Sequence, residues 1–461
     1  MVAIPKKESS LLLATACAIV AGGCSVSAIS PETEETPAPA SWARGGTPGD
    51  IGQNWLHTFS DPQLETLVSE SAENNYVLKQ ERERLYSAEQ AVRLSRSNRY
   101  PALDVSLGGA RRSTESSAGV SESFDIGVDG RWNVDIWRQL SKQQQATELA
   151  LAAQRARLQS VERDIAATTA QQYFDVIEAR QLLEVASRRL SNANESRDIV
   201  ASGYRQGLND ALDLYLARNQ VERERANFAS QEQALLEAVA DLQLSLARYP
   251  DGNMPIESKL PVLVDALPTG LPSELLTRRP DVQEAWLNLL ATDAELAAAH
   301  KARFPSLSIV GSSSRTTDAF SELLDGGVSA WSLAFSLTQP LFDAGRLAAL
   351  EEQAAARVRI AEQQYLDLVY RAFADVENSI SRTASLEQRY DALLEAEKNS
   401  RAALELALEQ YQRGLVPYTT VLESQRQAFD AEATVVQLTN QRLQNRIGLH
   451  LALGGEFVTA N

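Results

Sequence analysis

The stretch YRQGL (residues 204–208) returns almost unchanged as YQRGL (residues 411–415), nearly half of the 461-residue chain later. Each copy closes a long segment: residues 141–202 and 346–413 contain neither proline nor glycine. At about 1.5 Å per residue, each segment would form a helix of roughly 95–100 Å. Helices of that length belong in a rod or a tube, because a compact domain is much narrower.

The glycines of the two stretches, Gly207 and Gly414, predict the ends of these helices. A glycine can take the left-handed conformation that terminates a helix. A second helical pattern follows each corner, at residues 211–228 and 417–433. The sequence therefore predicts two long helical hairpins whose corners lie at the same far end, opposite the strands described below.

The repeat extends well beyond the corners. SNRYPALDVSLGG (97–109) matches KARFPSLSIVGSS (301–313), and NVDIWRQL (133–140) matches LTQPLFDAGRL (337–347). Each copy reads as helix, strand, loop, strand, long helix, corner and long helix, which indicates one architecture with internal pseudo-symmetry. The predicted parts are a first repeat at 53–250, a proline-rich bridge at 251–272, a second repeat at 273–455 and a tail at 456–461.

Apolar residues in the long segments follow a coiled-coil period. Leu366, Val369, Phe373, Val376 and Ile380 are separated by steps of three and four residues. This spacing places them on one seam between packed helices. The expected fold class is therefore α+β, with a long antiparallel coiled coil, duplicated in tandem.

Four strands are expected, at about residues 101–110, 123–136, 305–313 and 329–341. Apolar and polar residues alternate along them, so that one face of each strand is apolar. The pattern fits either a soluble antiparallel sheet or a membrane barrel with its apolar face toward lipid. Four strands cannot close a barrel; two chains would supply eight strands and three would supply twelve, and the alternation does not choose between them.

Composition excludes several function classes. The net charge of −17 argues against nucleic-acid binding, which needs a basic surface. The three histidines, His57, His300 and His450, have no ligand spacing, so neither a metal site nor a histidine-based catalytic site is predicted. No catalytic constellation is apparent, and the protein is not expected to be an enzyme.

The N-terminus reads as a leader. Lys6 and Lys7 precede the apolar run LLLATACAIVAGGC, which is too short to span a membrane. The run resembles a bacterial lipoprotein signal, with residues 1–23 removed, Cys24 acylated and residues 24–52 forming a lipidated linker. The alternative is an ordinary signal cleaved after Ala28. Ser25 follows the cysteine, and by the same resemblance this implies sorting to the outer membrane.

A longer motif points to a family. LLTRRPDVQEAWLNLLATDAELAAAHKARFPSLSIVG (275–311) closely resembles the signature of the TolC/OprM-type outer-membrane channels (outer membrane factor lipoproteins, NodT-like). QPLFDAGRL (339–347) and YQRGLVPYTTVLESQRQAF (411–429) are further matches, and the resemblance covers about residues 53–455.

The resemblance implies a homotrimer in the outer membrane of a Gram-negative bacterium. Its subunits share one twelve-stranded barrel, and their helices form a tunnel across the periplasm. The implied function is the exit duct of a tripartite efflux or secretion system, with a periplasmic adaptor and an inner-membrane pump of RND type as partners. No cofactor is implied beyond the covalent lipid on Cys24. The alternative is a coiled-coil adaptor or scaffold lipoprotein, and the cargo cannot be read from the sequence.

The resemblance also places a periplasmic gate at the second corner, at Tyr411, Thr419, Thr420, Glu423 and Arg426. Further gate partners or adaptor-contacting residues are expected at Arg205, Gly207, Asp213 and Gly414. If three Glu423 carboxylates met at one axis, their mutual repulsion would raise their affinity for protons. The alternative is that Glu423 is an ordinary exposed helical acid. Thr419 stands where the family often has leucine.

Overall fold

The computed structural model describes residues 38–45, 55–113, 120–208, 210–256, 259–263 and 267–455. The chain divides into two compact units, residues 1–38 and 39–461, and the architecture below is that of the second. Cys24, the predicted signal sequence, most of the predicted linker and the tail at 456–461 lie outside the described residues.

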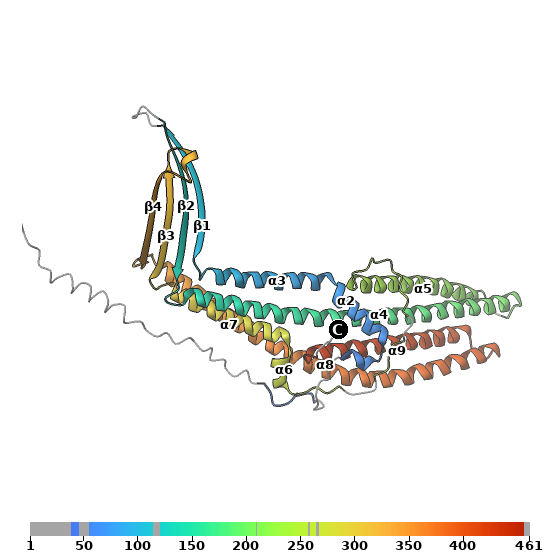
Figure 1. Cartoon of the computed structure of the whole chain (residues 1–461). Helices are drawn as coiled ribbons and strands as arrows, with labels where there is room; N and C mark the ends of the chain where they lie inside the picture. Colours follow the sequence, from blue (N-terminus) through green and yellow to red (C-terminus); the bar gives the residue numbers. More distant parts are fainter. Residues whose placement is uncertain are drawn as a thin grey trace, which may run out of the picture. The chain divides into compact units, whose positions relative to one another are not determined.

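Four long helices dominate the chain (Figure 1). Helices α4 (Gln139–Arg205) and α8 (Arg346–Gln412) have 67 residues each, and α5 (Ala211–Ser245) and α9 (Tyr418–Ala452) have 35 each. Helix α4 packs on α5, α8 packs on α9, and α9 also packs on α4, which joins the two hairpins. The two copies of the repeat therefore have hairpins of the same length.

The beginnings of α4 and α8 are alike in position but not in residue type. Arg138 precedes α4 with φ +60°, and Gly345 precedes α8 with φ +85°. Both are left-handed, a conformation that suits glycine and strains arginine. The carboxylate of Asp135 accepts hydrogen bonds from the Leu140 N–H (2.9 Å) and from Ser141, which helps to fix the strained turn.

Shorter elements surround the long helices. They are η1 (Trp55–Phe59), α2 (Pro62–Asn74), α3 (Tyr76–Ser97), α6 (Pro272–Arg278), α7 (Pro280–Lys301) and η2 (Phe320–Glu322). Helix α7 packs against both α4 and α8, and α3 packs against α4. No helix within the described ranges is both long enough and apolar enough to cross a bilayer.

One large apolar core covers the middle of the long helices. Phe59 of η1 packs on Phe174 of α4, with their rings 5.2 Å apart, and Trp55 of η1 stacks on His450 of α9 at 5.7 Å. Helices α2, α5 and α9 add further side chains, and the bridge contributes residues such as Met254 and Ile256. The proline-rich bridge is thus part of the core as well as a connection between the repeats.

The four strands form one antiparallel sheet in the order β1-β2-β3-β4. They are β1 (Ala102–Ser113), β2 (Val120–Val134), β3 (Ser306–Thr317) and β4 (Val328–Thr338). Strand β2 of the first repeat pairs with β3 of the second, so the sheet joins the two copies. This confirms the predicted α+β fold, in which four strands combine with long helical hairpins.

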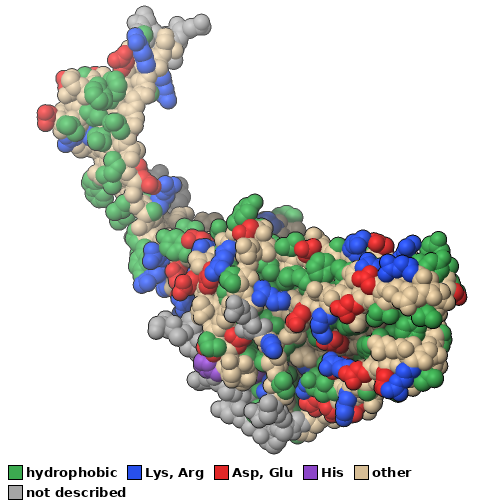
Figure 2. All heavy atoms as spheres, turned by 90° about the vertical axis from the view of Figure 1, so that its right-hand side faces the viewer, with side chains coloured by type: hydrophobic (Ala, Val, Ile, Leu, Met, Phe, Trp, Pro, Cys, Tyr) green, Lys and Arg blue, Asp and Glu red, His purple; other side chains and the backbone are tan. Residues whose placement is uncertain are grey.

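The pairing register separates an apolar face from a polar one. Trp132, Ile309 and Phe335 lie opposite one another across three strands, and the Phe335 side chain is 82% exposed. On the other parity, Asp104 pairs with Asp129 in register, and the Asp104 carboxylate lies 2.9 Å from the Arg131 guanidinium. Hydrophobic side chains are visible on the sheet, at the upper end of the molecule in Figure 2.

Candidate functional site

The first corner is closed by a hydrogen-bonding pattern that requires glycine. Gly207 has φ +75°. Its N–H donates to the Tyr204 carbonyl (3.0 Å), and the Leu208 N–H donates to the Gly203 carbonyl (2.9 Å). These two bonds define a Schellman motif, which satisfies carbonyls left free at the end of a helix.

The second corner repeats this geometry. Gly414 has φ +70°, its N–H donates to the Tyr411 carbonyl (2.9 Å), and the Leu415 N–H donates to the Gln410 carbonyl (2.9 Å). The leucines that follow the two glycines, Leu208 and Leu415, are 77% and 68% exposed. Each corner therefore presents an apolar side chain to the surroundings.

An apolar cluster holds the four helices together next to the corners. It contains residues of α4, α5, α8 and α9, namely Val200, Leu214, Ala217, Ala407, Tyr418 and Val421. The Tyr418 side chain is fully buried, and its ring lies 5.7 Å from the ring of Tyr411, which packs at the edge of the cluster. Burial, with the neighbouring Tyr411 and Asp213, raises the pKa of Tyr418 to about 12.

A buried polar contact joins the two hairpins above this cluster. The Gln425 side chain of α9 donates to the Ser196 hydroxyl of α4 at 2.9 Å, and both residues are buried. Sequence reasoning missed this pair. The signal that could have revealed it is a polar residue within an apolar seam. Ser196 lies between Ala193 and Val200 on α4, and Gln425 lies in the seam of α9.

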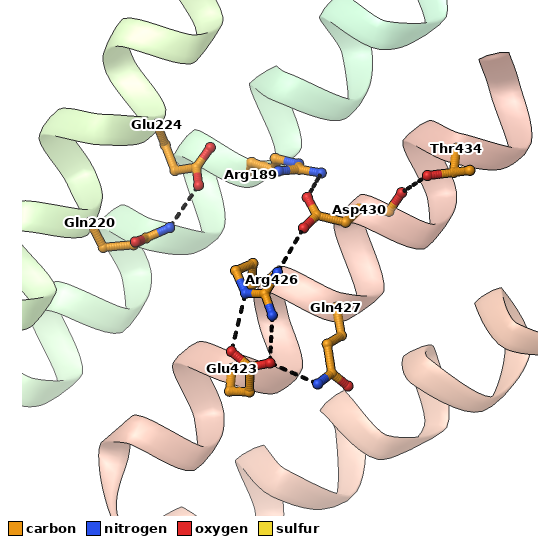
Figure 3. Close-up of polar contacts among 8 residues, drawn as sticks. All are labelled: Arg189, Gln220, Glu224, Glu423, Arg426, Gln427, Asp430 and Thr434. Carbon is orange, nitrogen blue, oxygen red and sulfur yellow. Dashed lines mark hydrogen bonds and ion pairs between the residues drawn. The ribbon is translucent and has the colours of Figure 1, made fainter.

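Glu423 and Arg426 belong to a chain of charged contacts (Figure 3). Arg426 donates to Glu423 through Nη2 (2.6 Å) and Nε (3.1 Å), and Arg426 Nη1 lies 3.3 Å from Asp430 Oδ2. The other oxygen of Asp430 accepts from Arg189 of α4 at 2.8 Å. This series of contacts thus runs along α9 and ends at Arg189 on the neighbouring hairpin.

Within one subunit, the neighbours of Glu423 stabilise its charged form. Hydrogen bonds from Arg426 and Gln427 lower the pKa of Glu423, and Glu423 in turn raises the pKa of Arg426. Within one chain these partners favour the charged carboxylate. The rise in proton affinity expected from three converging carboxylates would have to overcome them.

A second ion pair joins the hairpins further from the corners. Arg188 of α4 donates to both oxygens of Glu432 on α9, at 2.5 and 3.2 Å. Glu432 raises the pKa of Arg188, chiefly through this hydrogen bond. Neither residue was singled out from the sequence, because a contact between α4 and α9 follows from tertiary packing and leaves no local pattern.

The remaining predicted residues lie around the two corners. Thr419 and Thr420 are exposed in the first turn of α9. The Asp213 N–H donates to Asp210 at the start of α5 (2.9 Å), and Arg205 is exposed at the end of α4. Within the described residues, no ion pair joins Arg205 or Asp213 to the Glu423–Arg426 pair.

Long paired hairpins joined to a small sheet with an exposed apolar face define a class of protein, the outer-membrane tunnel. The comparisons agree. Residues 67–248 and 271–455 match the family model described as outer membrane efflux protein. The chain belongs to that family. It is an outer-membrane efflux channel protein, as its sequence motifs predicted. The alternative of an adaptor or scaffold is not retained.

Individual relatives cover nearly the whole chain. The probable outer membrane lipoprotein SilC of Salmonella typhimurium is 29% identical over 97% of this chain and 99% of its own. The solvent efflux pump outer membrane protein SrpC of Pseudomonas putida is 27% identical, over 95% and 96%. The cation efflux system protein CusC of Escherichia coli O157:H7 is 29% identical, over 87% and 88%. A crystal structure of CusC superposes with a TM-score of 0.82 at 28% identity, over 91% of this chain and 97% of that one.

Proposed function

We propose that three copies of the chain form one outer-membrane exit duct. The observation that carries the proposal is the sheet, in which β1 and β4 each have one edge that pairs with no strand among the described residues. Unpaired backbone groups are costly in lipid, and four strands are too few to close a barrel. The exposed apolar face, with Trp331 at 81% and Phe335 at 82%, fits a lipid environment.

The helices would form the periplasmic part of the duct. Helices of 67 residues reach about 100 Å. Cargo would be handed over at the corners and would leave through the barrel, without chemical change by the duct.

The corners would act as the gate. The α8/α9 hairpin is tied to α4 by Gln425–Ser196, Asp430–Arg189 and Glu432–Arg188. Opening would require the hairpins to separate, and the two ion pairs, which are partly exposed, are the contacts that break most easily in water. The buried Gln425–Ser196 pair would resist separation more strongly.

The partners would be a periplasmic adaptor and an inner-membrane pump of RND type. The relatives include proteins named for a solvent efflux pump and for a cation efflux system. The exposed Leu208 and Leu415 supply apolar contact points at both corners. Substituting both leucines with serine should abolish cross-linking of the duct to its adaptor while the trimer still assembles.

The lipid would be carried by Cys24. The leader pattern supports this, as does the description of SilC as a lipoprotein. In cells labelled with palmitate, the wild-type protein should incorporate label and the Cys24→Ser variant should not. Label retained by the variant would exclude this cysteine.

The duct proposal is tested by mass and by conductance. Solubilised protein should have the mass of three chains of 50.4 kDa, less their leaders, and should open channels in a planar bilayer. A stable monomer with native strand content, or a trimer that leaves bilayer conductance unchanged, would contradict it.

A further inference from the structure

A polar hollow of about 490 Å³ lies between α4, α8 and α9, well above the corners. Gln171 of α4 and Gln444 and Asn445 of α9 line it, together with Arg382 and Arg389 of α8. None of its lining residues is a carboxylate. In a chain with a net charge of −17, a hollow with two arginines and no acid is unexpected.

The two arginines differ from others on the same helix. Arg371 is paired with Asp367, one turn away, at 2.9 Å. Arg382 and Arg389 have no acidic residue three or four positions away in the sequence. Both are exposed, and no hydrogen bond or ion pair to either guanidinium is found in the described part of the chain. Their donors are therefore available to a ligand.

The acids nearest to the hollow are engaged by other groups. Asp175 of α4 accepts a hydrogen bond from Gln444, which lines the hollow, at 2.8 Å, and another from Asn440 at 2.6 Å. An adjoining hollow shares Arg382 and contains Asp281 and Asp375, but both of these carboxylates pair with Arg279, at 2.7 and 3.1 Å. Burial and the nearby Asp281 raise the pKa of its third acid, Asp164. Within the described residues, none of these acids forms an ion pair with Arg382 or Arg389.

The floor of the hollow holds a buried acceptor. Asn445 is only 6% exposed, and its amide nitrogen donates to the Ser379 carbonyl (3.1 Å) and the Thr383 hydroxyl (2.8 Å). Its oxygen has no hydrogen-bond partner within the described chain. A buried acceptor of this kind is costly to leave unpaired. A ligand with a hydroxyl group beside its negative charge would satisfy this oxygen once the side chains that cover it move aside.

The hollow opens away from the covered side of the helices. Leu443 and Ile447 of α9 face the core under η1 and α2. Gln441, which lines the hollow, lies about 160° around the helix from Leu443. On the proposed function, on which this inference rests, that side is the interior of the duct.

We propose that this hollow is an anion-binding station in the duct wall, which takes organic solutes carrying a carboxylate and a hydroxyl group. Arginine binds carboxylates through directed, charge-assisted hydrogen bonds. The same charges repel metal cations, so this level of the duct favours acidic organic cargo over free metal ions.

The test uses citrate, which carries three carboxylates and one hydroxyl. Binding to the solubilised trimer is measured by titration calorimetry near neutral pH and at fixed salt. R382Q/R389Q should weaken citrate binding at least tenfold, and R382K/R389K should weaken it less. The matched control is R357Q/R371Q, which removes the same charge from ion-paired arginines of the same helix. Equal binding by all variants, or no millimolar binding by the wild type, would overturn the proposal.

A bilayer measurement separates this inference from the duct itself. Citrate should reduce the current of wild-type channels and of the control, and should have at least tenfold less effect on R382Q/R389Q. Channels that conduct but are unaffected by citrate would refute the station and leave the duct intact. Citrate binding by a protein that forms no channels would refute the duct and leave the site intact.

Discussion

The two hairpins share their backbone and differ in their chemistry. Both pair a 67-residue helix with a 35-residue helix, and both turn at a glycine with φ near +70°. Yet Glu423 and Arg426 stand where the first repeat has Leu216 and Asn219. The duplication preserved the glycines that form the two corners, while the Glu423 and Arg426 side chains of the proposed gate occur in the second copy alone.

The two copies also carry different side chains at matched positions beside the polar hollow and in the apolar core. Arg382 of the second repeat corresponds to Asp175 of the first, so the two copies carry opposite charge at one level. His450 corresponds to Gln243. Substitutions that remove or exchange such side chains would show how much the residues of each copy contribute to stability.

The largest effect is expected at the apolar cluster beside the corners. Tyr418→Ala would leave a cavity where four helices meet, at a cost of about 3–5 kcal/mol. Amide hydrogen exchange in the first turns of α9 should accelerate strongly. The control is Tyr215→Ala on α5, where the side chain is 67% exposed. Comparable acceleration in both variants would show that the cluster does not hold the hairpins together.

A pH effect is expected from His450. Both ring nitrogens lack a partner in the described chain, and burial lowers the pKa of His450 to about 3. The unfolded chain takes up a proton near pH 6.5 and the folded chain does not. This group therefore costs no stability above pH 6.5. As the pH is lowered from about 6.5 to about 3, the free energy of unfolding falls by up to about 1.4 kcal/mol per pH unit.

The first repeat supplies the control for this effect. Gln243, the counterpart of His450, donates to Asp251 (2.7 Å) and to the Asn253 carbonyl (3.1 Å). His450→Gln should make the melting temperature depend less on pH between pH 6.5 and 4. An unchanged slope in the variant would place the acid sensitivity elsewhere.

A smaller effect is expected from the buried polar pair. Ser196→Ala would leave the Gln425 amide unpaired in the seam, at a cost of about 1–3 kcal/mol. Ser196→Ala combined with Gln425→Leu should recover most of this loss, because neither side chain of the pair then leaves a polar group unpaired in the seam. The melting temperatures of the two single variants and the double variant measure the coupling between Ser196 and Gln425. If the losses in the single variants add up in the double variant, the two residues are not coupled.

The smallest effect concerns the strained turn before α4. Arg138→Gly should stabilise the chain by about 0.5–1 kcal/mol, since glycine takes a positive φ without strain. Gly345→Arg at the matched position should destabilise it by a similar amount. Equal and opposite shifts in melting temperature would support the comparison; a loss of stability in Arg138→Gly would refute it.

Much of the fold was predictable, because local periodicity encodes it. The absence of proline and glycine gave the lengths of α4 and α8, and alternation gave the four strands. The site was predictable only in part. The Schellman corners follow from Gly207 and Gly414, but Asp430–Arg189 and Gln425–Ser196 join residues more than two hundred positions apart. Such pairs depend on how α9 packs on α4, which no window of sequence contains.

The central claim is that the corners of three chains close a duct and that the second hairpin holds the gate. The most direct measurement is the single-channel conductance of three proteins: the wild type, Glu423→Ala with Tyr411→Phe, and a control with Glu362→Ala in the first half of α8, far from the corner. The double variant removes the partner of Arg426 and alters the edge of the apolar cluster, so its conductance should rise above that of the other two, and large antibiotics should leak into the cells that carry it. Equal conductance in all three would contradict the gate.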